Sequence, residues 1–62
     1  MNELYEYLKS VNYQVSLDNN VVTIKNVTTT EILTLVKGIN FKELQIEAVV
    51  KESLTYDIRQ VK

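Results

Sequence analysis

Two segments of the chain, 3–14 and 31–42, carry the same pattern at a constant offset of 28 residues. Glu3 corresponds to Glu31 and Lys9 to Lys37, and the apolar residues form conservative pairs: Leu4 with Ile32, Leu8 with Val36, Val11 with Ile39 and Tyr13 with Phe41. If the repeat is a true duplication, each copy is one supersecondary unit that buries its apolar side against the other copy. The alternative is that any two amphipathic helices agree at their apolar positions, and the sequence leaves both explanations open.

Each of the two segments carries the pattern of an amphipathic helix. Apolar residues at i, i+3, i+4 and i+7 lie on one helical face, and this spacing is met by Leu4, Tyr7, Leu8 and Val11 and again by Ile32, Leu35, Val36 and Ile39. We expect the first helix to begin at Asn2, whose side chain would cap it, and to run to about Ser10. We expect the second helix to begin with a capping box formed by Thr28 and Glu31, and to end near Gly38 in a left-handed conformation.

A period of two follows each helix and predicts two β-hairpins. In the first hairpin, a strand from Tyr13 to Leu17 and a strand from Val21 to Val27 are joined by the turn 18–20, whose Asp and Asn residues tolerate left-handed backbone. In the second hairpin, we expect a strand over 44–50, a turn around 51–53 and a last strand over 54–61. The residues expected to face the core are Val22, Ile24, Leu44, Ile46, Ala48, Val50, Leu54, Tyr56 and Ile58.

The predicted order of elements is αββαββ within one domain, 1–62. This order indicates a two-layer α+β fold, with a four-stranded, antiparallel-rich sheet that carries both helices on one face. It also resembles a circularly permuted ferredoxin-like sheet, and that resemblance implies the spatial strand order 3-4-2-1. Two αββ units joined differently around a local two-fold axis are the alternative.

The composition excludes several classes of function. The chain has no Cys and no His, so the usual zinc sites, thiol nucleophiles and imidazole bases cannot form, and its single glycine excludes a glycine-rich phosphate loop. The carboxylate pair that could do acid–base chemistry, Glu47 and Asp57, would lie on a flat exposed face without a pocket. Seven basic against eight acidic residues supply no positive field for a nucleic acid. We therefore expect no enzyme activity, no cofactor and no nucleic-acid partner.

The length and the termini bear on assembly and location. A domain of 62 residues buries only about 60% of the surface that its unfolded chain exposes, so its stability is marginal and oligomerisation would help it. The N-terminus lacks a secretory pattern and no stretch approaches the roughly 18 apolar residues of a membrane span, so we expect a cytoplasmic protein without a membrane partner. The many Lys, Asn, Ile and Thr residues are compatible with an AT-rich genome, such as that of a low-GC bacterium or its phages.

Three groups of residues are candidates for binding a partner. Val21, Val27, Val49 and Val61 are expected on the sheet face away from the helices, where they either reflect the strand propensity of valine or form an interface. Tyr5 lies at the edge of the apolar face of the first helix, where it either completes the core together with Leu33 or anchors a contact. Lys25 and Arg59 either form a small basic spot or pair with carboxylates on neighbouring strands.

These observations favour a small, non-enzymatic protein-interaction or modulator module that forms a homo-oligomer, most simply a homodimer. Its contact surface would be the valine-bearing sheet face with an adjoining strand edge, and its further partner would be another protein. A nucleic-acid-associated regulator that uses Lys25 and Arg59 is one alternative. A small-ligand regulatory subunit is another, and it would require a pocket at a dimer junction.

Overall fold

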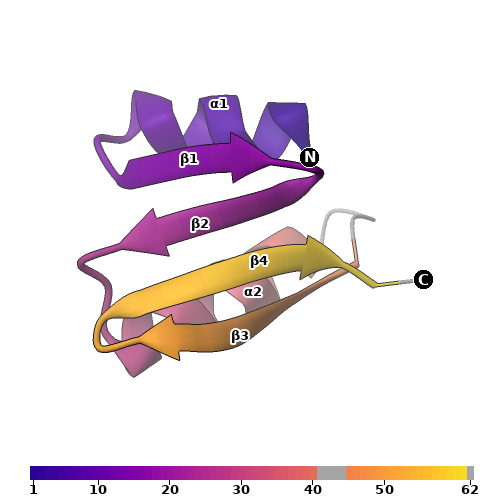
Figure 1. Cartoon of the computed structure of the whole chain (residues 1–62). Helices are drawn as coiled ribbons and strands as arrows, with labels where there is room; N and C mark the ends of the chain where they lie inside the picture. The colour runs from indigo at the N-terminus through magenta and orange to yellow at the C-terminus, as the bar shows by residue number, and fades with distance from the viewer. Residues whose placement is uncertain (41–44, 62) are drawn as a thin grey trace.

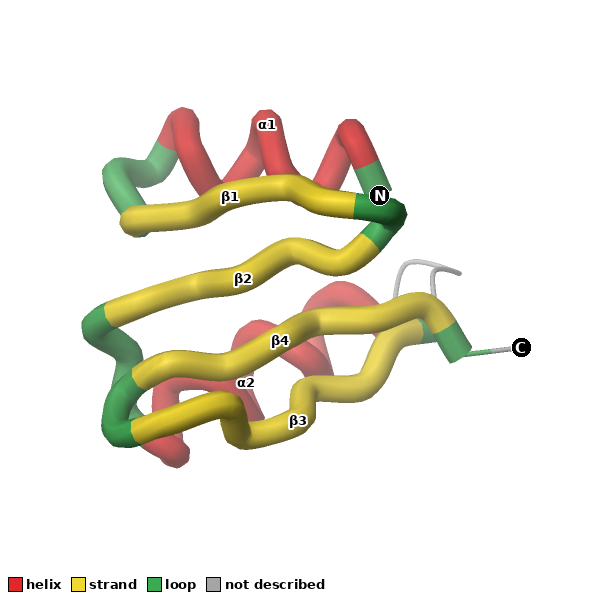
Figure 2. Tube along the Cα trace, in the orientation of Figure 1, coloured by secondary structure: helices red, strands yellow, loops and turns green. Residues whose placement is uncertain are grey.

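The computed structural model describes residues 1–40 and 45–61, and it folds into two layers (Figure 1). Along the chain the elements are α1 (Asn2–Ser10), β1 (Gln14–Asp18), β2 (Val21–Lys25), α2 (Thr29–Asn40), β3 (Ile46–Glu52) and β4 (Thr55–Gln60). Both helices lie on the same side of the sheet, so the fold belongs to the predicted α+β class (Figures 1 and 2). No helix within the described ranges is long and apolar enough to cross a membrane.

The four strands form one antiparallel sheet in the order β1-β2-β4-β3. This is the predicted order, 3-4-2-1, counted from the other edge. Because β2 and β4 occupy the centre, β1 and β3 are the edge strands. Helix α1 packs against β1 and helix α2 packs against β3, so each helix covers one half of the sheet.

Backbone hydrogen bonds lie at both ends of helix α1. Its N-cap is Met1, without a side-chain hydrogen bond, so the prediction that Asn2 caps the helix is wrong: Asn2 is already its first residue. The helix ends where Asn12 adopts a φ of 70°, and the N–H of Tyr13 then donates to the carbonyl oxygen of Leu8 at 3.1 Å. The left-handed residue turns the chain back, so β1 runs antiparallel to α1 along the same edge (Figure 1).

The predicted turn between β1 and β2 is present, but it is one residue shorter than expected because Asp18 belongs to β1. Asp18 pairs with Val21, so only two residues form the turn, and these are Asn19 with φ 49° and Asn20 with φ 64°. Positive φ angles at both residues of a two-residue loop are typical of a type I′ turn, whose twist matches that of the flanking antiparallel strands. Asparagine tolerates this left-handed conformation.

Helix α2 has the predicted start but not the predicted end. The hydroxyl of Thr28 accepts from the N–H of Glu31 at 3.1 Å, and the Glu31 carboxylate accepts from the N–H of Thr28 at 3.0 Å, which confirms the capping box. The helix then continues through Gly38 to Asn40, and Gly38 has no positive φ, so the expected C-terminus is wrong. The reason is that Ile39 continues the apolar stripe and packs against the core, which outweighs the low helix propensity of glycine.

The core lies between the helices and the sheet. Among the described residues, eight buried side chains form it: Leu4, Leu8, Val22, Ile24, Val27, Ile32, Ile46 and Ile58. The prediction for Val27 is wrong: this residue was expected on the outer face of the sheet, but it is 0% exposed and belongs to the core. Asn26 has a φ of 61° directly after β2, which interrupts the alternation of the strand and directs Val27 inward. The N–H of Val27 then donates to the carbonyl oxygen of Leu54 at 3.2 Å.

The β3–β4 turn lies later in the sequence than expected. It consists of Ser53 and Leu54, between the paired residues Glu52 and Thr55, and the pairing shifts between Val50 and Glu52. Leu54 has a φ of 57° and is 49% exposed, so the prediction that it faces the core is wrong. Thr55, which was not among the residues expected to face the core, is only 5% exposed, because β4 is a central strand with neighbours on both sides.

Candidate functional site

The outer sheet face does not gather the four predicted valines into one patch. Val27 belongs to the core, and Val61 follows the end of β4 and is half-buried. Val21 on β2 is half-buried and Val49 on β3 is 37% exposed, but β4 runs between these strands and places Asp57 opposite Val49. The valines on this face are therefore separated by polar side chains, as strand propensity alone would produce.

The polar side chains of this face pair across the strands. The hydroxyl of Thr23 donates to a carboxylate oxygen of Asp57 at 2.7 Å, and the Arg59 guanidinium lies 3.4 Å from the Glu47 carboxylate. This confirms that Arg59 pairs with a carboxylate on a neighbouring strand. Both members of the ion pair are 51% exposed, so the pair contributes at most about 1 kcal/mol. Each of the two carboxylates considered for acid–base chemistry already has its own partner.

Lys25 and Arg59 do not form the basic spot that was considered. The register places Lys25 opposite Thr55 and Arg59 opposite Glu47. Since Thr55 and Arg59 are four residues apart on β4, the backbone positions of Lys25 and Arg59 lie roughly 13 Å apart along the strand direction. That separation removes the geometric basis for a nucleic-acid site built on these two residues.

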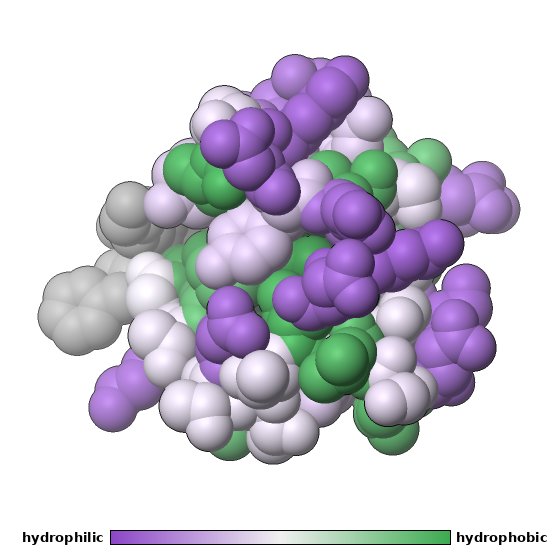
Figure 3. All heavy atoms as spheres, turned by 90° about the vertical axis from the view of Figure 1, so that its left-hand side faces the viewer, coloured by the Kyte–Doolittle hydropathy of each residue, from purple (hydrophilic) through white to green (hydrophobic). Residues whose placement is uncertain are grey.

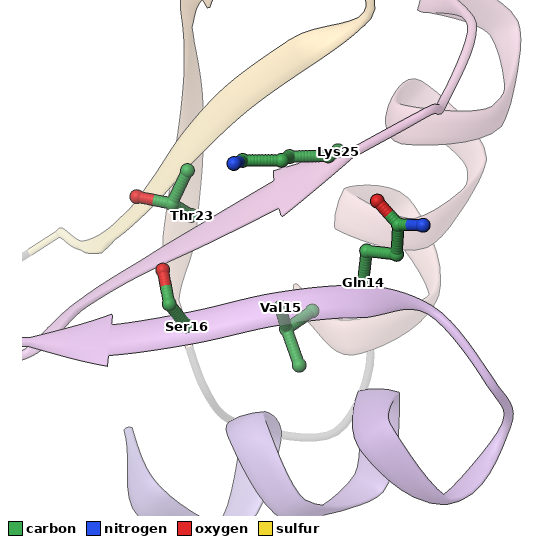
Figure 4. Close-up of a pocket in the computed structure, with 5 residues that line it drawn as sticks. All are labelled: Gln14, Val15, Ser16, Thr23 and Lys25. Atoms are coloured by element: carbon green, nitrogen blue, oxygen red, sulfur yellow. The ribbon is translucent and has the colours of Figure 1, made fainter.

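Lys25 instead lines a shallow hollow over β1 and β2. Its volume is about 160 Å³, and the side chains of Gln14, Ser16, Thr23 and Lys25 surround it, while Val15 points away, toward α1 (Figure 4). Pockets that bind small molecules usually enclose about 300–1,000 Å³ and are mostly apolar. The hollow is smaller and open, and polar side chains border it, so it does not have the features of a ligand site.

Tyr5 completes the core, which was one of its two expected roles. It is half-buried, packs against the core cluster, and lies with its ring centroid 5.7 Å from Nζ of Lys9. It does not meet Leu33, because the groove between the helices is lined by Tyr7, Thr34, Leu35, Gly38 and Ile39. Leu33 is 63% exposed on another side of α2.

The position of Leu33 follows from the helical rotation of about 100° per residue. Ile32, which is buried, faces the sheet, and Leu35 lies about 60° to the side that borders α1. Leu33 lies about 100° to the opposite side, which is the side of β3, the edge strand that α2 contacts. An exposed leucine therefore flanks the β3 edge of the sheet.

Val50 is exposed at the same edge. It was expected to face the core, and its partner Tyr56 does point to the helical side, where the Tyr56 hydroxyl lies 2.8 Å from the hydroxyl of Thr29. Val50 is nevertheless 66% exposed, because β3 is an edge strand and its pairing shifts directly after this residue. From the left-hand side of Figure 1, the upper half of the molecule is largely hydrophilic, whereas the lower half, toward α2 and β3, is mainly pale or hydrophobic (Figure 3).

The backbone of β3 adds hydrogen-bonding groups to this edge. The N–H of Val61 donates to the carbonyl oxygen of Gln45 at 2.8 Å, so Gln45 directs its polar groups toward β4. By the alternation of an antiparallel ladder, Glu47 and Val49 do the same, whereas Ala48 and Val50 direct their N–H and C=O groups away from β4. Among the described residues, no strand pairs with β3 on that side.

We name this surface the β3 edge and define it by Ala48, Val49, Val50 and Leu33. Sequence reasoning anticipated an adjoining edge but missed Val50 and the role of Leu33. The available signal was the run Ala48-Val49-Val50, which is apolar on both faces of a strand. Such a run indicates either a buried strand or an edge that pairs with another molecule.

Comparison with protein-family models, with curated proteins and with solved structures found no match to this chain. Within residues 1–40 and 45–61, no three carboxylates gather closely enough to hold a metal ion. The arrangement of the side chains therefore carries the functional argument.

Proposed function

We propose that this chain is a small, non-enzymatic protein-interaction module that associates with itself through the β3 edge. The observation that carries the proposal is the coincidence of outward-directed backbone groups at Ala48 and Val50 with exposed apolar side chains at Val50 and Leu33. Polar backbone groups confer affinity when a strand is added to a sheet edge, and neighbouring apolar side chains add buried area. Its location in the cytoplasm remains a prediction from the sequence.

The small size of the domain supports self-association. A chain of 62 residues has a limited core, and two exposed side chains at the β3 edge, Leu33 and Val50, would be removed from water by a second molecule. Among the described residues the buried cluster has eight apolar side chains, so covering two more would add appreciably to the buried apolar area. Binding of another protein at the same edge would have the same physical basis.

The test is light scattering across a range of protein concentrations. We expect the average mass of the wild-type protein to rise toward twice the monomer mass, and we expect Leu33→Lys and Val50→Lys to remain monomeric at the same concentrations. Val11→Lys is the matched control, because Val11 is an exposed valine, at 45%, but lies at the end of α1 and away from β3. Self-association that is equally weakened by all three substitutions, or by none, would refute the role of the β3 edge.

We also propose that the two αββ halves derive from one duplicated unit and form a permuted ferredoxin-like sheet. The strand order supports this proposal, and so do Leu4 and Ile32, which correspond in the repeat and are both buried. The halves differ where Asn12 ends α1 with a φ of 70° while its counterpart, Asn40, is still within α2. Separate expression of 1–27 tests for an autonomous unit, which we expect to assemble as a dimer if the duplication is ancestral. A segment 1–27 that stays unfolded and monomeric would contradict the proposal.

A further inference from the structure

We infer that β3 of one copy pairs antiparallel with β3 of a second copy, in a register centred on Val49. The inference rests on the proposed function and specifies the geometry of its self-association. Both sheets would then join into one continuous sheet, with the helices of both copies on the same face. The argument uses the symmetry of such a pair, the order of charges along β3 and the direction of its backbone groups.

Symmetry restricts the possible registers. Two identical edge strands become antiparallel neighbours in one sheet only when the two-fold axis is perpendicular to the sheet, and then both copies present the same face on the same side. Residues directly opposite one another point to one face. A residue of β3 can therefore lie opposite only a residue of the same face. It follows that one residue must lie opposite its own counterpart, with the axis midway between the two copies of that residue. Ala48, Val49 and Val50 are the central candidates.

The charges on β3 select among these three registers. With the axis at Val49, Glu47 lies opposite Lys51 of the second copy, and the same pair forms again on the other side of the axis. With the axis at Ala48, Glu47 would lie opposite Val49, and with the axis at Val50, Lys51 would lie opposite Val49. Opposite charges across two strands stabilise the pairing, so the register centred on Val49 is favoured. Val49 lies within the regular part of β3, over 46–50, because the pairing with β4 shifts only after Val50.

The backbone directions agree with this register. Ala48 and Val50 direct their N–H and C=O groups to the open side, and an axis at Val49 places Ala48 opposite Val50 of the second copy. These residues can exchange hydrogen bonds on both sides of the axis. Val49 would then face its own counterpart in a non-hydrogen-bonded pair, with a Cα separation of about 4.5 Å.

The surrounding side chains fit the same arrangement. Glu47 already lies 3.4 Å from Arg59, so the second copy's Lys51 would complete a row of alternating charges, Arg59, Glu47 and Lys51. On the helical face, Val50 and Leu33 are both more than half exposed at this edge, and a second copy would cover them. Each element of the β3 edge therefore gains a contact.

One feature of β3 would favour a monomer instead. The pairing with β4 shifts between Val50 and Glu52, and Lys51 lies within this shift. Bulges and edge lysines are also devices that keep sheet edges from pairing. They would leave the protein monomeric. The dimer and the monomer differ in the role of Glu47. A lysine that only blocks edge pairing needs no acidic partner, whereas the dimer requires Glu47 to lie opposite Lys51 of the second copy.

A charge-reversal experiment tests the register in the full-length protein. Glu47→Lys and Lys51→Glu each place like charges opposite each other twice in the proposed dimer, so we expect each variant to weaken self-association by on the order of tenfold. An equimolar mixture of the two variants should form a heterodimer, since every pair is then of opposite charge. Circular dichroism of each variant confirms that it is folded. Weakened single variants that are not rescued by mixing would overturn the register but leave self-association standing, whereas a strictly monomeric wild-type protein would overturn both proposals.

A cysteine pair gives a second readout, since the chain has no native Cys. Val49→Cys should form a disulfide-linked dimer under mild oxidation, because a Cα separation of about 4.5 Å lies within disulfide range. Val50→Cys is the control: its own counterpart would lie roughly 8–9 Å away, beyond disulfide range, although Val50 is the more exposed residue, at 66% against 37%. Efficient crosslinking through Val50→Cys, together with none through Val49→Cys, would overturn the register centred on Val49.

Discussion

Replacing Val27 by alanine tests whether this residue is part of the core, because sequence periodicity alone places it on the outer face. Val27 is 0% exposed, and its N–H donates to the carbonyl oxygen of Leu54 at 3.2 Å. Alanine keeps that backbone hydrogen bond and removes only the two γ-methyl groups. The measured change therefore reports side-chain packing.

The expected loss follows from the methyl groups that are removed. Two buried methyl groups account for about 1.6 kcal/mol of transfer free energy, at about 0.8 kcal/mol each. A cavity of roughly 45 Å³ that does not collapse adds about 1 kcal/mol, at about 24 cal/mol per Å³. We therefore expect a loss of about 1.6–2.7 kcal/mol, against a total stability of about 3–9 kcal/mol for a chain of this length.

Urea unfolding followed by circular dichroism measures this loss. With a denaturant slope of about 1 kcal/mol per molar, the midpoint should fall by roughly 2 M. Val21→Ala is the matched control, since Val21 is half-buried on β2 and the same two methyl groups should cost less than half as much there. All proteins are compared at one concentration, because self-association would add to each stability. Equal losses at Val27 and Val21 would refute the inward direction that we attribute to Asn26.

Three further substitutions test local features, each by the free energy of unfolding in urea. Thr28→Ala removes the side-chain half of the capping box and should cost about 1 kcal/mol, whereas Thr28→Ser should cost little; an unchanged stability in Thr28→Ala would contradict the capping role. Gly38→Ala should stabilise the protein by about 0.8–1 kcal/mol, since nothing lies within 4 Å of the added methyl group, and a loss would show that the helix groove is closed there. Leu54→Gly should not destabilise the protein. Glycine relieves the backbone strain of the left-handed conformation, about 1–2 kcal/mol, and this offsets the burial free energy lost with the half-exposed leucine side chain. A loss of stability above about 1 kcal/mol would contradict this reasoning.

Periodicity and local hydrogen-bonding chemistry predicted most of the fold. The spacing of Leu4 and Leu8, the capping box at Thr28 and the turn at Asn19 each depend on neighbouring residues alone, and each is present in the structure. Single residues with positive φ caused the main errors. Asn26 reverses the facing of Val27 just after β2, and Leu54 occupies a left-handed position in which a leucine is not expected.

The β3 edge could be predicted only in part, because exposure depends on which strands lie at the margin of the sheet. Val50 and Ile58 both satisfy the alternation for a core residue, yet one is 66% exposed and the other is 0% exposed. The difference is that β3 is an edge strand and β4 is central. The charges at Glu47 and Lys51 were visible in the sequence, but their symmetry about Val49 acquires meaning only when β3 is known to be an edge strand.

The dimensions of the two layers explain why this edge is left uncovered. Four strands spaced about 4.8 Å apart span roughly as much width as two helices of about 10 Å diameter, so the helical layer covers the sheet with no width to spare. Helix α2 must also reach inward to bury Ile32, which turns Leu33 out past the side of β3. Neither helix can move over Val50 without uncovering residues closer to the centre. Among residues 1–40 and 45–61 no element covers Val50 and Leu33, and the charges of β3 are self-complementary about Val49, so our proposal assigns the covering surface to a second copy of the chain.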